Sequence, residues 1–464
     1  MGWIQAVKRF VGGLMVLGLA WGGAGVVGAA PADPELIQRG EYLARVGDCV
    51  ACHTAPGGPV FAGGLELPTP VGNIVATNIT PSKTAGIGNY TLEQFDAAVR
   101  RGIRADGKPL YPAMPYPSYA KVTDEDIEAM YAYFMNAVEP VETRPPQTKL
   151  PFPFNIRYSM KLWNALFLDE TPFQPDPSQG EEWNRGAYLV QGLTHCSTCH
   201  SPRNFLMAED SSRDLAGGEV GPWHAPNITS DPVSGVGSWS LEEIVAYMKQ
   251  GSIPKSQAAG PMAEAIDHSF QYMTDADLRA MAVYLKSVPP IAEDGVKKPV
   301  DSWGRAHADF ASVRGKPWPE NPDELNGPQL FDAYCAACHQ ASGQGTFDRQ
   351  MPALYQNTAT GRLQTNNLVM VILEGIHRVS QGYEVRMPGF AHELSDQQIA
   401  TLSNYLMQAY GNPDGQTSAE QVANLRQGGP VSSSNLILLA RAGMVVGLLV
   451  VLALVVWLVR RRRS

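Results

Sequence analysis

The chain has 464 residues, with 45 acidic against 36 basic side chains and a formal net charge of −9 at pH 7. Seven of the basic residues lie in two terminal segments described below, so the remaining body holds 45 acidic against 29 basic side chains. Nucleic-acid binding calls for a clustered positive surface. The charge balance therefore argues against nucleic acid as a partner.

The first residues are typical of an export signal. Two basic residues precede a largely apolar stretch over residues 10–27, and small residues follow it. This succession of a basic, an apolar and a small-residue region is that of a secretory signal peptide. We therefore predict a signal peptide over residues 1–32, with cleavage near Ala30 or Ala32.

All six cysteines of the chain fall into three Cys-x-x-Cys-His motifs. In the c-type haem motif, two thiols form thioether bonds to the porphyrin and the adjacent histidine becomes the proximal ligand of the iron. The sequence therefore predicts three covalently bound haem c groups, which bacteria attach outside the cytoplasm. The motif residues are Cys49, Cys52 and His53; Cys196, Cys199 and His200; and Cys335, Cys338 and His339.

Zinc binding and thiol redox chemistry are the other interpretations of a Cys-x-x-Cys pair. A structural zinc site needs four ligands, usually from two pairs held close together, whereas more than a hundred residues separate these pairs. A thioredoxin-type pair is expected once, near a βαβ pattern, and does not explain the histidine after every second cysteine. The pattern favours haem and leaves no cysteine for a structural disulfide.

A capped amphipathic helix is predicted three times. Each copy begins with a Ser or Thr cap and an acidic residue, and apolar residues follow three to four positions apart. The matching positions are Thr123, Asp124, Ile127, Met130, Tyr133 and Phe134; Thr274, Asp275, Leu278, Met281, Tyr284 and Leu285; and Ser395, Asp396, Ile399, Leu402, Tyr405 and Leu406. The chain therefore repeats one small unit three times.

Each unit also holds a methionine between a helix-ending glycine and this capped helix. These residues are Met114, Met262 and Met387, each eleven or twelve residues after its glycine. A methionine sulfur opposite the histidine is common in electron-transfer cytochromes, where it raises the potential and closes the iron to substrates. We predict these three methionines as the second axial ligands, with His268 and His392 as alternatives.

Long proline-rich linkers separate the three units. The first linker carries an aromatic-rich stripe at helical spacing, which packs either on the body or on a partner or membrane surface; it consists of Ile156, Met160, Trp163 and Phe167. The predicted divisions are a signal peptide at 1–32, domains at 33–138, 181–288 and 326–410, linkers at 139–180 and 289–325, a spacer at 411–435, a transmembrane helix at 436–459 and a cytoplasmic tail at 460–464.

The C-terminal segment predicts a membrane anchor. Residues 442–459 carry no charge, and eighteen helical residues span about 27 Å, against a hydrocarbon core of roughly 30 Å. Four arginines follow at 460–463, and such a cluster stays on the cytoplasmic side. We therefore expect a single-pass anchor in the bacterial inner membrane, with the haem domains on the periplasmic side.

A unit with an early Cys-x-x-Cys-His motif, a late methionine and a capped terminal helix resembles a class I cytochrome c domain. Three in tandem resemble the triheme cytochrome c subunit of membrane-bound alcohol, gluconate, sorbitol and fructose dehydrogenases. The similarity covers essentially the whole exported chain, including Pro151–Asn155 and a proline beside each proposed methionine. It implies an all-α fold of three tandem cytochrome c domains.

The resemblance implies an electron-transfer subunit. Electrons would pass from a large quinoprotein or flavoprotein dehydrogenase subunit, acting on an alcohol, sugar or sugar acid, through three haems to ubiquinone or the respiratory chain. No catalytic residue is expected, because histidine and methionine fill both axial positions of each iron. Two alternatives stay open: an electron-acceptor subunit of a molybdenum hydroxylase, and a free-standing membrane-anchored shuttle to a terminal oxidase or reductase.

Overall fold

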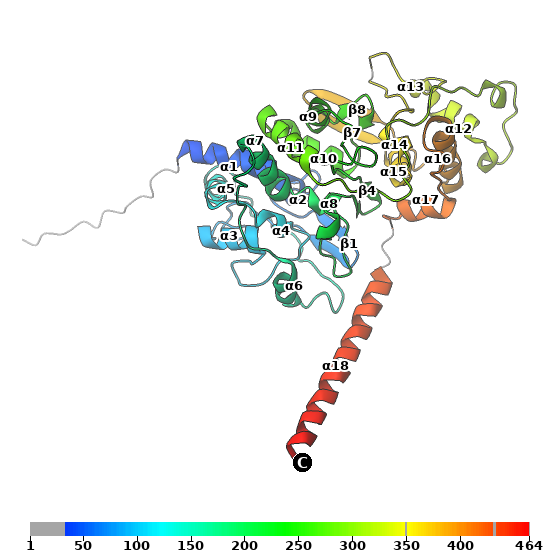
Figure 1. Cartoon of the computed structure of the whole chain (residues 1–464). Coiled ribbons are helices and arrows are strands. Elements are labelled where there is room, and N and C mark those ends of the chain that lie inside the picture. Colours follow the sequence, from blue (N-terminus) through cyan, green and yellow to red (C-terminus); the bar gives the residue numbers. More distant parts are fainter. Residues whose placement is uncertain (1–32, 349, 430–432, 464) are drawn as a thin grey trace, which may run out of the picture.

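The computed structural model describes residues 33–348, 350–429 and 433–463. Within these ranges, helices and short strands form a body from which the helix α18 (Ser433–Arg463) extends (Figure 1). The signal peptide predicted for residues 1–32 lies outside the described residues.

Secondary structure falls into three successive segments, each containing one Cys-x-x-Cys-His motif. The first holds α1 (Pro34–Val46), α2 (Cys49–His53), β1 (Glu66–Thr69), β2 (Gly72–Val75), α3 (Leu92–Arg101), α4 (Tyr116–Tyr119), α5 (Asp124–Asn136) and, in the linker after it, α6 (Ser159–Phe167). The second holds α7 (Glu181–Tyr188), the π-helix η1 (Leu189–Leu193), α8 (Ser197–His200), η2 (Ser211–Arg213), β3 (Gly218–Val220), β4 (Trp223–Ala225), α9 (Leu241–Gln250), β5 (Ser252–Ile253), β6 (Ser256–Gln257), α10 (Pro261–His268), η3 (Phe270–Tyr272) and α11 (Asp275–Ser287). The third holds η4 (Phe310–Ser312), η5 (Pro322–Glu324), α12 (Gly327–Tyr334), α13 (Ala336–His339), α14 (Thr358–Gly361), α15 (Asn366–Glu374), β7 (Ile376–Ser380), β8 (Tyr383–Met387), α16 (Asp396–Tyr410) and α17 (Ala419–Arg426).

The three capped helices predicted from the sequence are present as α5, α11 and α16. The side chains of Thr123, Thr274 and Ser395 each accept a hydrogen bond from the backbone N–H three residues later. This bond satisfies one of the N–H groups that the first helical turn leaves without a partner. The repeated caps therefore fix where the last long helix of each segment begins.

A glycine lets the first long helix of each segment cross the last one closely. A Cβ added at Gly40 would lie 1.9 Å from the carbonyl oxygen of Ala129, so any side chain there would force α1 and α5 apart. The same arrangement recurs where α7 crosses α11 and where α12 crosses α16. The crossing glycines are Gly40, Gly186 and Gly327, and they face Tyr133, Tyr284 and Tyr405 respectively.

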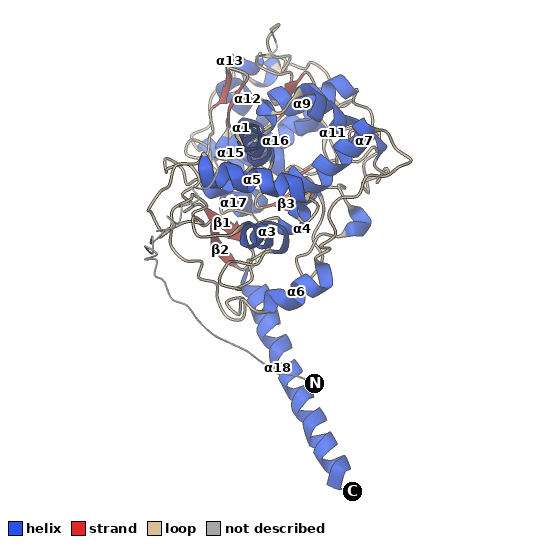
Figure 2. Ribbon diagram, turned by 90° about the vertical axis from the view of Figure 1, so that its left-hand side faces the viewer, coloured by secondary structure: helices blue, strands red, loops and turns tan. Residues whose placement is uncertain are grey.

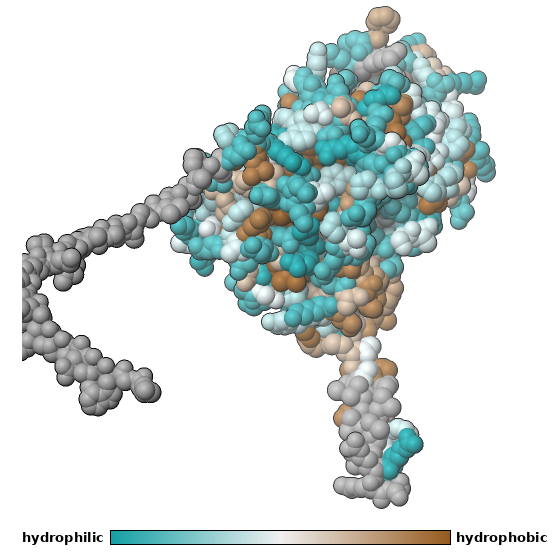
Figure 3. Space-filling view, turned by 60° about the vertical axis from the view of Figure 1, so that its left-hand side comes forward, coloured by the Kyte–Doolittle hydropathy of each residue, from teal (hydrophilic) through white to brown (hydrophobic). Residues whose placement is uncertain are grey.

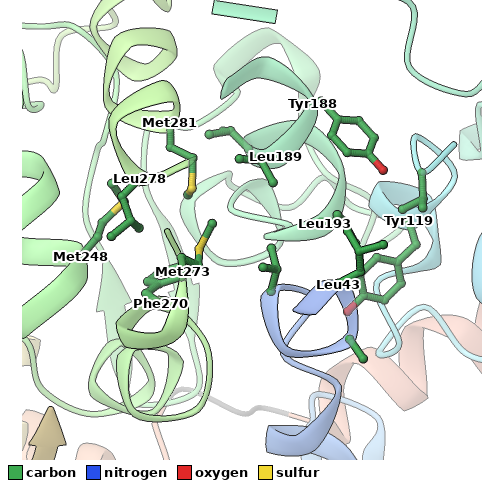
Figure 4. Packing of buried hydrophobic residues seen from close by; sticks show 14 of the residues in the cluster. Leu43, Tyr119, Tyr188, Leu189, Leu193, Met248, Phe270, Met273, Leu278 and Met281 are labelled. Atoms are coloured by element: carbon green, nitrogen blue, oxygen red, sulfur yellow. The ribbon is translucent and has the colours of Figure 1, made fainter. Parts of the chain in front are cut away.

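One hydrophobic cluster joins the first two segments. Figure 4 shows Leu43 of the first segment close to Leu189 and Leu193 of the second, with Met273 and Met281 nearby. The third segment is built around a second cluster, which includes residues of α12, α15 and α16. The apolar interiors of the first two segments are therefore continuous, whereas the third has a core largely of its own.

The expectation of an all-α fold is wrong, because the described residues include four two-stranded antiparallel sheets (Figure 2). The pairs are β1 with β2, β3 with β4, β5 with β6, and β7 with β8. In the last hairpin, Gln381 and Gly382 form the turn with φ of 50° and 79°. Positive φ at both turn residues matches the right-handed twist of paired strands, so this short Gln-Gly turn makes a hairpin where helices alone were predicted.

The C-terminal prediction also needs correction. Residues 433–463 form the helix α18, which contains the predicted segment 436–459. Among the described residues, however, no helix combines the length and the apolar character needed to cross a membrane. Arg441 and the arginines at 460–463 flank the uncharged run at 442–459, so the uncharged part is much shorter than the helix that contains it. We therefore correct the prediction of a transmembrane helix and of a single-pass C-terminal anchor.

Three of the four residues of the stripe predicted in the first linker lie on α6, at the end of the body from which α18 extends (Figures 1 and 2), while Ile156 precedes the helix. The Trp163 indole N–H donates to the carbonyl oxygen of Leu206 at 2.9 Å, and its ring packs edge-on against Tyr116. Leu162 and Leu166 are instead 68% and 60% exposed. Figure 3 shows apolar surface at this end of the body. The interpretation as packing on the body therefore holds for Trp163, while neighbouring leucines face outward.

Candidate haem sites

Each Cys-x-x-Cys-His motif lies on a short helix that follows the first long helix of its segment. The first motif forms α2, while α8 and α13 begin directly after the first cysteine of the second and third motifs. All six cysteines have free thiols. One turn of helix spans about 3.6 residues, so each helix presents its two thiols and its histidine within little more than one turn.

The histidine of each motif uses its ring nitrogen Nδ1 in the same way. Nδ1 lies at hydrogen-bond distance from a backbone carbonyl oxygen and therefore donates its proton there, which leaves the lone pair of Nε2 free. Such a bond orients the ring and increases its strength as a metal ligand. The distances are 2.6 Å from His53 to Thr77, 2.6 Å from His200 to Pro226 and 3.0 Å from His339 to Pro352.

A glycine after each motif holds the backbone of the same histidine. The glycine amides donate to the histidine carbonyl oxygens at 2.8 Å (Gly63 to His53), 2.7 Å (Gly217 to His200) and 3.0 Å (Gly345 to His339). A Cβ added at Gly63 would lie 2.4 Å from the carbonyl carbon of Thr77, so glycine lets that carbonyl reach the His53 ring. These glycines were not predicted, although Ala-Gly-Gly recurs at 62–64 and 216–218.

Burial controls the protonation of the motif side chains. It raises the pKa of Cys49 and Cys335 to about 12 and that of Cys52 and Cys196 to about 11. It lowers the pKa of His200 to about 4, and it also lowers the pKa of the other two motif histidines. The imidazoles are therefore neutral at pH 7, which is the form that binds a metal.

The three methionines predicted as ligands lie on different elements. Met114 precedes α4 in a loop, Met262 lies in the first turn of α10, and Met387 ends β8. All three are partly buried, whereas the alternatives His268 and His392 are exposed. An apolar surrounding controls the access of solvent to a metal. The exposure of the two histidines therefore favours the three methionines. Their role as ligands stays a prediction.

The first two motifs lie beside each other. His195, which precedes the second motif, packs edge-on against Tyr119 with ring centroids 5.6 Å apart. The Tyr119 hydroxyl donates at 2.6 Å to the carbonyl oxygen of Gly47, two residues before the first motif. In addition, α10, which carries Met262, contacts α2. The packing of these loops therefore brings the first two candidate haem sites together.

Comparison with known proteins agrees with this arrangement. The cytochrome c family model matches residues 325–409. The chain is also 44% identical over 451 residues to the fructose dehydrogenase cytochrome subunit of Gluconobacter japonicus, an alignment that covers 94% of this chain and 93% of that protein. This chain belongs to the family of dehydrogenase cytochrome c subunits.

Two further members of the family align along most of their length. The cytochrome c subunit of alcohol dehydrogenase (quinone) from Gluconacetobacter polyoxogenes is 41% identical over 417 residues, 87% of each chain. The gluconate 2-dehydrogenase cytochrome c subunit of Pantoea cypripedii is 38% identical over 409 residues, 85% of this chain and 90% of that one. The family model matches a single cytochrome c domain, so the predicted tandem of three such domains is corrected to one recognised domain.

Membership of this family establishes covalently bound haem c as the cofactor, electron transfer as the function and a dehydrogenase as the partner. The residues present fit the cofactor in all three motifs. Each motif offers two free thiols and a neutral imidazole whose Nδ1 is already engaged. This is the donor set that c-type haem requires.

Proposed function

We propose that this cytochrome c subunit carries three haem c groups and passes electrons from a large dehydrogenase subunit to ubiquinone. The observation that supports the count is the threefold repetition of one histidine environment. In each motif, Nδ1 is bound to a carbonyl oxygen and the backbone is held by a glycine amide. The three motifs therefore offer the same prepared ligand, which supports one haem at each.

Haem iron, when bound, supplies one-electron oxidation and reduction. The chain's own residues would hold it in three ways. The thiols of each motif would form the thioether bonds, and Nε2 of the histidine would be the proximal ligand. Met114, Met262 and Met387 would supply sulfur on the opposite side and close the iron to substrates. The subunit would then have no substrate site of its own.

The electron donor is proposed from the relatives. Their names give fructose, alcohol and gluconate dehydrogenases. All three substrates offer a hydroxyl-bearing carbon for oxidation, so we assign the partner of this chain to the dehydrogenases that act on alcohols, sugars or sugar acids. The acceptor is proposed as ubiquinone because the alcohol dehydrogenase relative is named for a quinone.

The test begins with gentle purification of the native complex. Mass spectrometry identifies the large subunit, and the pyridine haemochrome spectrum gives the number of haems per chain. Replacing both cysteines of one motif by alanine (Cys49 and Cys52, Cys196 and Cys199, or Cys335 and Cys338) should each time reduce the haem content by one third. A reduced complex should return its electrons to a soluble ubiquinone analogue.

The outcomes separate the parts of the proposal. Three haems with a quinoprotein or flavoprotein subunit support it fully. A motif whose cysteines can be replaced without loss of haem would overturn the count. A protein that purifies alone with its full haem content, and reduces an oxidase but not quinone, would favour a free-standing shuttle.

A further inference from the structure

Arg378 on β7 is buried between the second and third segments. Its side chain is 0% exposed, and it is the largest side chain among the described residues to be buried so completely. One guanidinium nitrogen, Nη1, donates at 2.8 Å to the carbonyl oxygen of Ala258. Nε and Nη2 are buried without a hydrogen-bond partner among the described residues. A buried cation normally has an anionic partner, because removing its charge from water is costly.

The hairpin that carries Arg378 is fixed firmly on the second segment. The backbone N–H of Val379 donates to Asp267 at 3.1 Å, and the Ser380 hydroxyl donates to the carbonyl oxygen of Gln250 at 2.7 Å. The side chain of Gln381 donates to the carbonyl oxygen of Gln271 at 2.8 Å. These bonds determine the position of β7, so Arg378 enters the second segment in one defined place.

A glycine of the second segment leaves room for the Arg378 side chain. A Cβ added at Gly251 would lie 2.4 Å from Nε of Arg378, so the glycine makes room for the guanidinium. In the first segment, the equivalent glycine, Gly102, is covered by Tyr116, whose hydroxyl is bound to Asn164 at 2.7 Å. The second segment thus receives Arg378, whose Nε and Nη2 have no partner among the described residues. At the equivalent position the first segment holds Tyr116, whose hydroxyl has a partner.

A second arginine of the third segment reaches the same region. Arg362, directly after α14, has Nη1 buried without a hydrogen-bond partner among the described residues. Burial raises the pKa of Tyr247 on α9, and the positive charges of Arg378 and Arg362 both act to lower it. The geometry agrees, because α14 is bound to the second segment directly before Arg362: the hydroxyls of Ser256 and Thr358 lie 2.8 Å apart, and the Thr358 N–H donates to the carbonyl oxygen of Lys255 at 2.9 Å.

The acidic side chains around these arginines are engaged elsewhere or form no ion pair with them. Asp267 accepts from the backbone of Val379, and Asp301 pairs with Lys255 at 3.2 Å. Glu293 acts on Arg362 through its charge but has a buried oxygen without a partner, and it is not within ion-pair distance. Burial lowers the pKa of both arginines. Among the described residues, no carboxylate forms an ion pair with either guanidinium group, although the charges of Glu293 and Asp301 favour the charged form of Arg362 and that of Asp267 favours the charged form of Arg378.

We propose that Arg378 and Arg362 of the third segment bind the two propionate carboxylates of the haem attached to Cys196 and Cys199. Haem c carries two such carboxylates, so their number and charge match two guanidinium groups with free donors. The place also matches, because Ala258 lies four residues before Met262 and α14, which directly precedes Arg362, is bound to β6 directly before Ala258. This inference rests on the proposed presence of a haem at the second motif.

The test uses the full-length chain with its haems attached, titrated spectroelectrochemically. Arg378→Gln removes the charge, Arg378→Lys keeps it, and Arg386→Gln removes an exposed charge from the neighbouring strand β8 as a matched control. The redox transition (wave) of the second haem is identified as the one that disappears when Cys196 and Cys199 are replaced by alanine. Without the cation, the unbalanced carboxylates stabilise the oxidised iron, so Arg378→Gln should lower that potential alone. We expect roughly a tenfold shift in the ratio of oxidised to reduced haem, or about 59 mV for one electron.

Haem content is measured first and separates the two levels of the proposal. Fewer than three haems in the unchanged chain would refute the proposed function. Three haems together with an unshifted second wave in Arg378→Gln would overturn only the propionate assignment, as would equal potentials for the Lys and Gln variants. If Arg378→Gln does not fold, Arg362→Gln tests the same assignment, and an unchanged second potential in that variant would refute it.

Discussion

Tyr42 on α1 donates a hydrogen bond of 2.6 Å to Asp277 on α11, 235 residues further along the chain. The reverse contact also exists, because Tyr188 on α7 donates at 2.5 Å to Asp126 on α5. The first segment therefore supplies a phenol to the second, and the second supplies one to the first. This reciprocity indicates an approximate twofold relationship between the two segments, whose apolar cores are also continuous.

Replacing either tyrosine by phenylalanine should destabilise both segments together. Tyr42→Phe or Tyr188→Phe leaves a buried carboxylate with one donor fewer, and hydrogen bonds to charged groups contribute about 1.5–3 kcal/mol. We expect a decrease of that size in the free energy of unfolding, measured by urea denaturation of the haem-loaded protein. Tyr158→Phe, at a position 59% exposed, is the control and should change little. Variants that match this control would show that the reciprocal bonds do not contribute to stability.

The stability of the first two segments should fall in acid. Burial alone would raise the pKa of Asp277, but hydrogen bonds from Arg185 and Tyr42 and the charge of Arg185 bring it below its ordinary value. A carboxylate whose pKa is depressed by folding stabilises the protein above the unfolded pKa of about 3.9, and this contribution is lost as the pH falls through the folded value. Unfolding measured from pH 6 to pH 3 should show this loss. The loss should be smaller in Asp277→Asn, while the exposed Asp332→Asn should retain the full pH dependence.

The helix crossing of the first segment should not tolerate a methyl group. Gly40→Ala places Cβ 1.9 Å from the carbonyl oxygen of Ala129. Overpacking of this kind costs about 1–3 kcal/mol, and more where the backbone cannot move. Thermal unfolding should therefore begin at a lower temperature. Gly443→Ala in α18, where an added Cβ meets nothing within 4 Å, is the control. A Gly40→Ala protein as stable as this control would mean that the two helices separate at little cost.

Replacing any one of the three predicted methionine ligands should change the properties of one haem. Met114→Leu, Met262→Leu and Met387→Leu should each lower the potential of one haem and allow it to bind carbon monoxide, because the sulfur that closes the iron is removed. Met273→Leu is a suitable control, since Met273 is a core residue only 1% exposed and follows η3. It should alter stability without changing any haem spectrum. A ligand variant with unchanged spectra and potentials would remove that methionine from the assignment.

Local patterns in the sequence were sufficient for part of this structure. The caps at Thr123, Thr274 and Ser395 start helices because their signal lies within a few residues. The hairpins were missed because their strands are only two to five residues long, too short for a clear alternation of apolar and polar side chains. The position of Arg378 could not be predicted at all, since it depends on a contact with Ala258, 120 residues away in the chain.

The 120 residues between Ala258 and Arg378 also determine the order in which the second segment can be completed. Ala258 and Gly251 leave the ribosome well before Arg378, and at 5–20 residues per second the delay of 120 residues amounts to roughly 6–24 s. During that time, the niche over Gly251 has no side chain of the third segment to fill it. Until the β7–β8 hairpin docks, the niche over Gly251 is therefore open, and the arrival of Arg378 closes it. A chain truncated before β7 would be held in the state that the complete protein passes through only during synthesis.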